Sequence, residues 1–295
     1  MIGPRWMIPV LLIAFGTTAT AQSAAKLAVD AAADRAERHQ TAEWLSLAPH
    51  LPDPEAGTAQ ALETAADVMR ARRMPEDALD YYHFALKRGG DEPTLDNRIG
   101  VTLLELRRPT EARAYFKRAL LLKPKDAQEW NNLGAAEYVL GNYRAALEDY
   151  LRAVKLDRKT AVFHSNLGTA YFEVKDYDSA RAQLQKAIRL DPNVFQGNGW
   201  AGVEAHVLSP TDHGRFCYEM AKLAAEQHDE AGMLRWLARS SEGGFDVQTP
   251  MSGDKAFYPY RKDPRIAVIV RNAKAMRSGQ LADARPVPPL PANAP

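Results

Sequence analysis

The sequence has few of the residues from which disulfide frameworks and catalytic centres are built. Its 295 residues include one cysteine, Cys217, so no internal disulfide can form. It contains no glycine-rich phosphate loop, no GxSxG turn around a nucleophilic serine and no HExxH zinc motif. These absences favour a non-catalytic protein that needs no cofactor.

Net charge is also scarce, since 38 basic residues face 37 acidic ones. A chain this close to neutral has no general electrostatic attraction for nucleic acid or for anionic lipid. We therefore expect protein or peptide partners, no nucleic acid and no stable membrane insertion of the processed chain.

Long hydrophobic runs are missing too, and the one apolar stretch lies at the N-terminus. Arg5 precedes a ten-residue apolar run over residues 6–15, and small residues follow at 19–21. A membrane-spanning helix needs about 20 apolar residues, so this run fits a secretory signal better than a span. We expect residues 1–21 to be a signal peptide cleaved after Ala21, and the chain to be periplasmic or secreted. The alternative is an uncleaved N-terminus that anchors the protein in the inner membrane.

What the sequence does contain is an internal repeat. Residues 127–160 align with residues 161–194 after a shift of 34 positions. The shift places Leu133 and Gly134 on Leu167 and Gly168. Matching aromatic and alanine pairs are Tyr143 with Tyr177, Ala146 with Ala180, and Ala153 with Ala187. A fixed period of this length is the signature of a repeat architecture.

The repeat resembles the tetratricopeptide repeat (TPR), whose 34-residue pattern of Leu-Gly, Tyr, Ala, Ala and Pro it follows. The resemblance implies an all-α, right-handed superhelix (α-solenoid) of helix–turn–helix units, of the exported bacterial type. Four units are predicted, over residues 59–92, 93–126, 127–160 and 161–194. The small residues of each unit are expected to let its helices approach closely.

Helix boundaries agree with this frame. Pro75 and Pro109 can open the second helices of the first two units, where a missing N–H costs least. Asn142 and Asp176 are expected to cap the second helices of the next two, and Asp126 the first helix of the third unit.

Segments outside the four units are predicted to cover or extend the array. Residues 22–58 read as an N-terminal helix, with Trp44 and Leu45 among its apolar anchors, and a proline-rich linker. After an insertion at 195–213, residues 214–247 read as a divergent TPR-like unit. A capping segment follows at 248–277, in which Ile266, Val268, Ile269 and Val270 cover the last unit. Residues 278–295 form a proline-rich tail that is expected to be disordered.

The TPR resemblance also implies where a partner binds. In such arrays the first helices line a concave groove, and residues three and four apart share its face. The predicted peptide-binding residues are Asn97, Arg98, Val101, Asn131, Asn132, Tyr138, Ser165, Asn166, Thr169 and Phe172. An open alternative is that the asparagines bond only to neighbouring helices.

Two further partner classes can be compared with the sequence. The clamp by which TPR chaperone adaptors hold an acidic C-terminus is matched here only at Asn132, so that mode is not expected. A metal site would need three or four converging ligands, and only His213 and Cys217, with Asp212 and His206 nearby, suggest one.

We therefore predict a protein-binding scaffold or adaptor in cell-envelope assembly, with no catalytic residues, no metal and no cofactor. The alternatives are an enzyme or metal-binding protein with a site in residues 206–217, and a purely self-associating structural protein that forms homo-oligomers.

Overall fold

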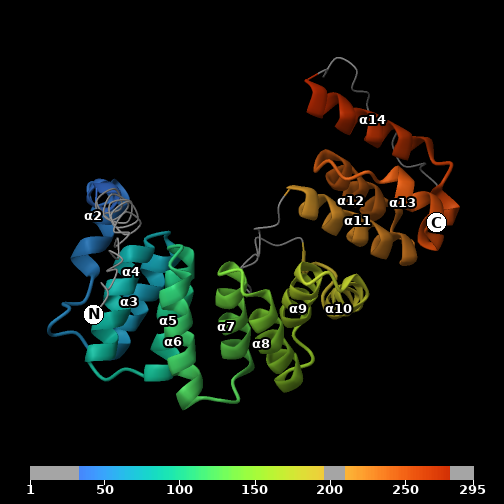
Figure 1. The fold of residues 1–295 in the computed structure, drawn as a ribbon. Coiled ribbons are helices and arrows are strands. Elements are labelled where there is room, and N and C mark those ends of the chain that lie inside the picture. The colour runs from blue at the N-terminus through green and yellow to red at the C-terminus, as the bar shows by residue number, and fades with distance from the viewer. Residues whose placement is uncertain (1–32, 196–209, 280–295) are drawn as a thin grey trace, which may run out of the picture. The chain divides into compact units, whose positions relative to one another are not determined.

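The computed structural model describes residues 33–195 and 210–279, and all regular elements in these two ranges are helices (Figure 1). The chain divides into two compact units, Met1–Gly90 and Asp91–Pro295. The predicted signal peptide, most of the predicted insertion and nearly all of the tail lie outside the described residues.

The first unit is built on one helix pair. Its elements are α2 (Ala42–Leu47), the 3-10 helix η1 (Ala48–His50), α3 (Ala59–Ala71) and α4 (Pro75–Lys87), and residues 33–38 are also helical. Leu62, Ala66 and Met69 of α3 are completely buried, as are Ala78 and Tyr82 of α4. These apolar side chains recur three and four residues apart, so each helix buries one face.

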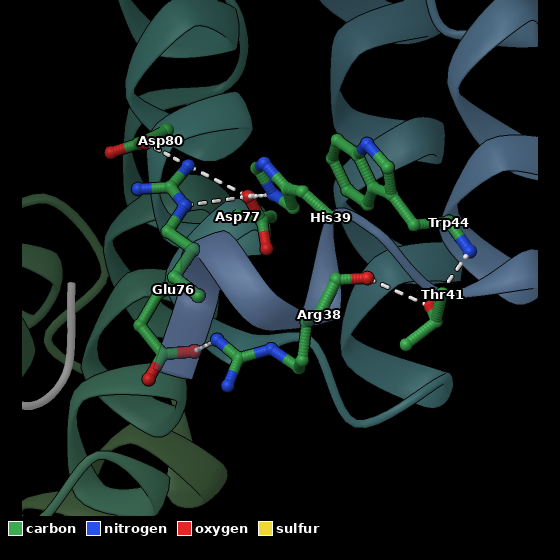
Figure 2. A network of polar contacts seen from close by, with 8 residues as sticks. Arg38, His39, Thr41, Trp44, Glu76, Asp77 and Asp80 are labelled. Atoms are coloured by element: carbon green, nitrogen blue, oxygen red, sulfur yellow. Dashed lines mark hydrogen bonds and ion pairs between the residues drawn. The ribbon is translucent and has the colours of Figure 1, made fainter. Parts of the chain in front are cut away.

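The N-terminal segment, residues 33–47, contacts α4 through charges rather than through the expected apolar anchors. Arg35 donates from Nε to Asp77 Oδ1 at 2.7 Å and from Nη2 to Asp80 Oδ2 at 2.7 Å. In Figure 2 His39 faces the same Asp77, with 2.9 Å between Nε2 and Oδ1. Leu45 is 59% exposed, so its prediction as an anchor was wrong. The buried carboxylate of Asp77 needs a cationic partner, and this segment supplies it.

The second unit contains the remaining helix pairs and a closing segment. In chain order its elements are α5 (Glu92–Glu105), α6 (Pro109–Leu122), α7 (Ala127–Val139), α8 (Tyr143–Leu156), α9 (Ala161–Glu173), α10 (Tyr177–Leu190), α11 (Pro210–Glu226), α12 (Glu230–Glu242), α13 (Gln248–Gly253), the 3-10 helix η2 (Lys255–Tyr260) and α14 (Pro264–Ser278). Each odd-numbered helix from α5 to α11 packs on the helix that follows it. The predicted all-α TPR solenoid fold is confirmed.

Repeated glycines on the first helices mark where a large side chain of the second helix crosses. A Cβ added at Gly134 would lie 2.8 Å from the Tyr150 ring, and one added at Gly100 would lie 2.5 Å from the Phe116 ring. Real Cβ atoms do not approach other heavy atoms this closely, so these positions require glycine. The close approach therefore joins a glycine to a bulky residue, where the sequence suggested contact between small residues on both helices.

One residue in the turn between the two helices of each TPR unit has left-handed backbone geometry. The residues with positive φ at this turn are Arg73, Arg107, Gly141, Lys175 and His228. The first four are spaced 34 residues apart. His228 occupies the same position when Gly214 is counted as the first residue of a unit. The turn between α11 and α12 thus repeats the turn of the regular units.

Two of the three predicted N-caps form. Asp126 accepts from the backbone N of Gln128 at 2.9 Å, and Asp176 accepts from that of Ser179 at 3.1 Å. The prediction for Asn142 was wrong, because its side-chain amide donates to Glu137 Oε2 at 2.7 Å and makes no capping hydrogen bond.

Helix α14 closes the C-terminal part of the second unit against α12. Ile266 and Ile269 are 6% and 5% exposed and share one apolar cluster with Met233, Leu237 and Phe257. Among the described residues, none of the helices has both the length and the apolar character needed to cross a membrane.

Candidate peptide-binding face

The ten predicted binding residues lie on α5, α7 and α9, and we call the surface that they define the first-helix face. Their exposure separates them into two groups. The buried group is Asn131, Asn132, Tyr138, Asn166 and Phe172. The partly exposed group is Asn97, Arg98, Val101, Ser165 and Thr169.

The asparagines of this face form a ladder of side-chain hydrogen bonds across the three helices. Asn166 of α9 donates from Nδ2 to Asn131 Oδ1 of α7 at 2.8 Å. Asn132 of α7 donates in the same way to Asn97 Oδ1 of α5 at 2.8 Å. A longer contact of 3.4 Å from Asn131 Nδ2 to Asn132 Oδ1 connects the two bonds within α7. We call these four residues the asparagine ladder.

Burial explains why the ladder forms. Asn131 is completely buried, and Asn132 and Asn166 are 7% and 9% exposed. A buried amide that lost its hydrogen bonds to water without replacing them would be strongly destabilising. The hydrogen bonds to neighbouring helices that the sequence allowed therefore form, and they join α5, α7 and α9.

The two aromatic candidates also link one unit to the next. Tyr138 of α7 donates from its hydroxyl to Glu173 Oε1 of α9 at 2.6 Å, and burial raises the pKa of this phenol. Phe172 of α9 contacts Tyr177 and Phe216 edge to face, with ring centroids 5.2 Å and 5.5 Å apart. Both rings are at most 3% exposed, so they pack the array rather than present an apolar surface.

Partly exposed side chains are left on either side of α7. Asn97 and Val101 lie four residues apart on α5, and Ser165 and Thr169 lie four residues apart on α9. This spacing puts each pair on one face of its helix. Asn97 Nδ2 makes no hydrogen bond within the described residues, so it has a donor to offer.

The sequence-based site did not include Gln128, which extends the ladder. This exposed residue of α7 donates from Nε2 to Asn132 Oδ1 at 2.9 Å. The 34-residue frame places Gln128 on the same face as Asn132, because residues four apart on a helix are neighbours.

A buried carboxyl group lies in the same helix. Glu129 is 4% exposed, and its Oε2 has no hydrogen-bond partner within the described part of the chain. Burial raises the pKa of this carboxyl to about 8, and the negative charges of Asp126 and Asp96 act in the same direction. Glu129 therefore keeps its proton at neutral pH.

Comparison with known protein families agrees with this geometry. Two family models, both described as tetratricopeptide repeat, match residues 61–129 and 126–193. This chain is a TPR protein. The matched ranges together run from α3 to α10 and include the whole first-helix face.

Solved structures similar to this TPR protein include YrrB, described as a TPR protein with an unusual peptide-binding site. It is 27% identical, with 46% of this chain and 70% of YrrB covered and a TM-score of 0.41. MamA from Desulfovibrio magneticus RS-1 is 18% identical, covering 66% of this chain and 97% of its own, with a TM-score of 0.46. Pseudomonas aeruginosa PilF is 17% identical, covering 76% and 87%, with a TM-score of 0.48. No curated protein matches the chain.

Two of the residues suggested as metal ligands, His213 and Cys217, lie among the described residues of this TPR protein. His213 Nε2 lies 3.5 Å from Cys217 Sγ, one helical turn apart on α11. Cys217 is completely buried, and burial raises the pKa of its thiol to about 11, which opposes the thiolate that a metal would need. Within residues 33–195 and 210–279 no three His, Cys, Asp or Glu side chains converge, and His206 lies outside these ranges.

Proposed function

We propose that this TPR protein is a non-catalytic scaffold whose first-helix face binds an extended peptide segment of a partner protein. The family supports a role in protein–protein interaction. The observation that carries the narrower proposal is the asparagine ladder, which holds α5, α7 and α9 at set distances beneath partly exposed polar side chains.

The ladder reduces the conformational entropy that is lost when a peptide binds to this face. Its members are already ordered by bonds to one another, so little freedom is lost when a peptide arrives. Asn97 and Ser165 can then exchange hydrogen bonds with a peptide backbone, while Val101 offers apolar contact. The buried residues Asn131, Tyr138 and Phe172 act in this proposal as support for the face and do not touch the peptide.

The chemistry of the face favours a segment without strong negative charge. TPR adaptors that bind acidic tails carry lysine at two positions of their clamp. In this chain those two positions are Asn97 and Val162, so neither carries a positive charge. We therefore propose a neutral, extended peptide in which backbone groups provide most of the recognition.

Selection from a random peptide library, followed by titration of the selected peptides, tests this proposal. The blocking variant is Val101→Arg with Thr169→Arg, which places long charged side chains on α5 and α9. Its matched control is Ala114→Arg with Ala182→Arg, at exposed positions on the second helices α6 and α10. We expect the blocking variant to weaken binding at least tenfold and the control to leave it unchanged. Equal binding by both variants would contradict the proposal.

A place in the cell envelope is part of the same proposal and rests on the sequence of residues 1–21. If these residues are a signal peptide, the chain isolated from its native cells begins at Gln22. Sequencing of the N-terminus after cell fractionation tests this, and an intact Met1 start in the cytoplasmic fraction would contradict it.

A further inference from the structure

The nearly neutral second unit carries positive charge at one end of its helix pairs. In a stack of such pairs the second helices run in the same direction, so the ends of α6, α8 and α10 lie at one edge. Three windows at that edge, residues 121–126, 155–160 and 189–194, contain six basic and three acidic residues. The windows at the opposite turns, residues 105–110, 139–144 and 173–178, contain four of each. We call the first edge the basic end.

Most cations of the basic end have no acidic partner. Lys123 pairs with Asp91, 3.2 Å away. The other exposed cations of the first two windows make no ion pair within the described ranges: Lys125, Lys155, Arg158 and Lys159.

The acidic groups of the first two windows are already engaged by the chain itself. Asp126 caps α7 by accepting from the backbone N of Gln128 and of Glu129. Asp157 accepts from Thr160 Oγ1 at 2.6 Å and from the backbone N of Lys159 at 2.8 Å. The neighbouring Glu129 carries a proton at neutral pH because its pKa is about 8, so it does not cancel the positive charge. The basic end therefore presents its cations outward.

Leucines are exposed among these cations. Leu121 is 83% exposed, and Leu122 and Leu156 are 50% and 44% exposed. Leu121 is the unusual one, because the equivalent positions one and two repeats later are Lys155 and Arg189. Large apolar side chains next to free cations are the composition of surfaces that enter the headgroup region of a bilayer.

The connection that follows Leu121 and Leu122 at the end of α6 is held by contacts of Trp130. Trp130 donates from its indole N–H to the Pro124 carbonyl at 3.0 Å. The guanidinium of Arg152 lies 4.5 Å from the centre of the same indole ring. Leu121 and Leu122 therefore stand at the end of a helix whose following connection is already ordered, which lowers the entropy that docking would cost.

We propose that the basic end docks on an anionic lipid bilayer, with Leu121, Leu122 and Leu156 entering the interface and the free cations facing the lipid phosphates. A bilayer fits this edge better than an acidic protein segment does, because the apolar and basic groups come from the helix ends and connections of successive repeats and a broad surface reaches them together. The first-helix face is formed by other residues and stays available for a peptide.

Vesicle co-sedimentation of the full chain tests the proposal, with the gain in binding on adding about 30% phosphatidylglycerol to phosphatidylcholine as the readout. Using the gain removes any contribution of the apolar N-terminus that does not depend on lipid charge. The edge variant replaces four cations by glutamine: Lys125, Lys155, Arg158 and Lys159. The matched control replaces four at the opposite turns: Arg107, Arg108, Arg144 and Lys175.

We expect phosphatidylglycerol to increase vesicle binding roughly tenfold for the wild type and the control, and to increase it little for the edge variant. Leu121→Gln should retain binding at low salt and lose it when salt screens the charges. The proposal fails if anionic lipid brings no gain, or if both four-residue variants lose it equally. It also fails if soluble polyglutamate binds the wild type and these vesicles do not.

Discussion

The guanidinium of Arg35 and the carboxylate of Asp77 join the N-terminal segment to the first repeat across 42 positions of sequence. Asp77 is 1% exposed, and its Oδ2 has no hydrogen-bond partner within the described part of the chain. The acid is thus buried at the start of α4, where Arg35 donates to it and His39 faces it (the His39 contact is shown in Figure 2). The segment therefore does more than cover an apolar end.

Replacing Arg35 by glutamine should lower the free energy of unfolding of the first unit by about 1–3 kcal/mol, because it leaves the buried Asp77 carboxylate short of a hydrogen-bond donor. The control is Arg38→Gln. Arg38 pairs with Glu76, both side chains are partly exposed, and such a pair contributes about 0–1 kcal/mol. Urea unfolding compares the two. Equal losses would show that the burial of Asp77 does not decide the effect.

The contact between Gly134 and Tyr150 predicts a strict requirement for glycine. Gly134→Ala should cost about 1–3 kcal/mol, since the new methyl group would lie 2.8 Å from the ring. Truncating the ring removes the atoms that the new methyl group would meet, so Gly134→Ala combined with Tyr150→Ala should cost less than the two single changes added together. Additive losses in a double-mutant cycle would argue against this contact.

The asparagine ladder predicts that one of its buried members stabilises the array. Asn166→Ala removes the donor to Asn131 and leaves a buried acceptor without a partner, so we expect a loss of about 1–3 kcal/mol. Ser165→Ala, at the adjacent and partly exposed position, should change stability by less than about 0.5 kcal/mol. Thermal unfolding of both variants provides the comparison. An unchanged stability of Asn166→Ala would show that the ladder does not stabilise the array.

Glu129 predicts a loss of stability as pH rises through the range between its unfolded and folded pKa values. Its pKa is raised from 4.5 to about 8 in the folded chain, so folded and unfolded forms are equally protonated well below pH 4. As pH rises, the unfolded chain loses this proton first. Stability therefore falls between about pH 4.5 and 8 and then levels off.

Glu129→Gln removes this proton and should make the stability of the chain less dependent on pH. Between about pH 5 and 8 the wild type should lose a few kcal/mol relative to the variant. Unfolding in urea at several pH values measures the difference, and parallel curves for the two proteins would contradict the assignment.

The repeat frame could be predicted from the sequence because its determinants are local. Periodic glycines and alanines, Pro75 and Pro109 at helix starts, and the capping side chain of Asp126 act within one helix or one turn. Their effect does not depend on what lies elsewhere in the chain, so the order of helices, the TPR fold and two of three caps follow from the linear pattern. The left-handed turn residue is equally local, which is why it recurs at His228 in a unit whose other residues diverge.

Exposure and pairing were decided by the tertiary structure. Asn97 and Asn132 lie 35 residues apart, and only the stacking of α5 against α7 brings their amides within 2.8 Å. The same stacking buries Tyr138 and Phe172, which sequence reasoning had placed at the surface of a groove. The folded arrangement also leaves Lys155 without an acidic partner at the basic end. A sequence pattern determines which face of a helix is apolar, but the amount of water that reaches each polar atom depends on neighbouring helices, and those neighbours exist only in the folded chain.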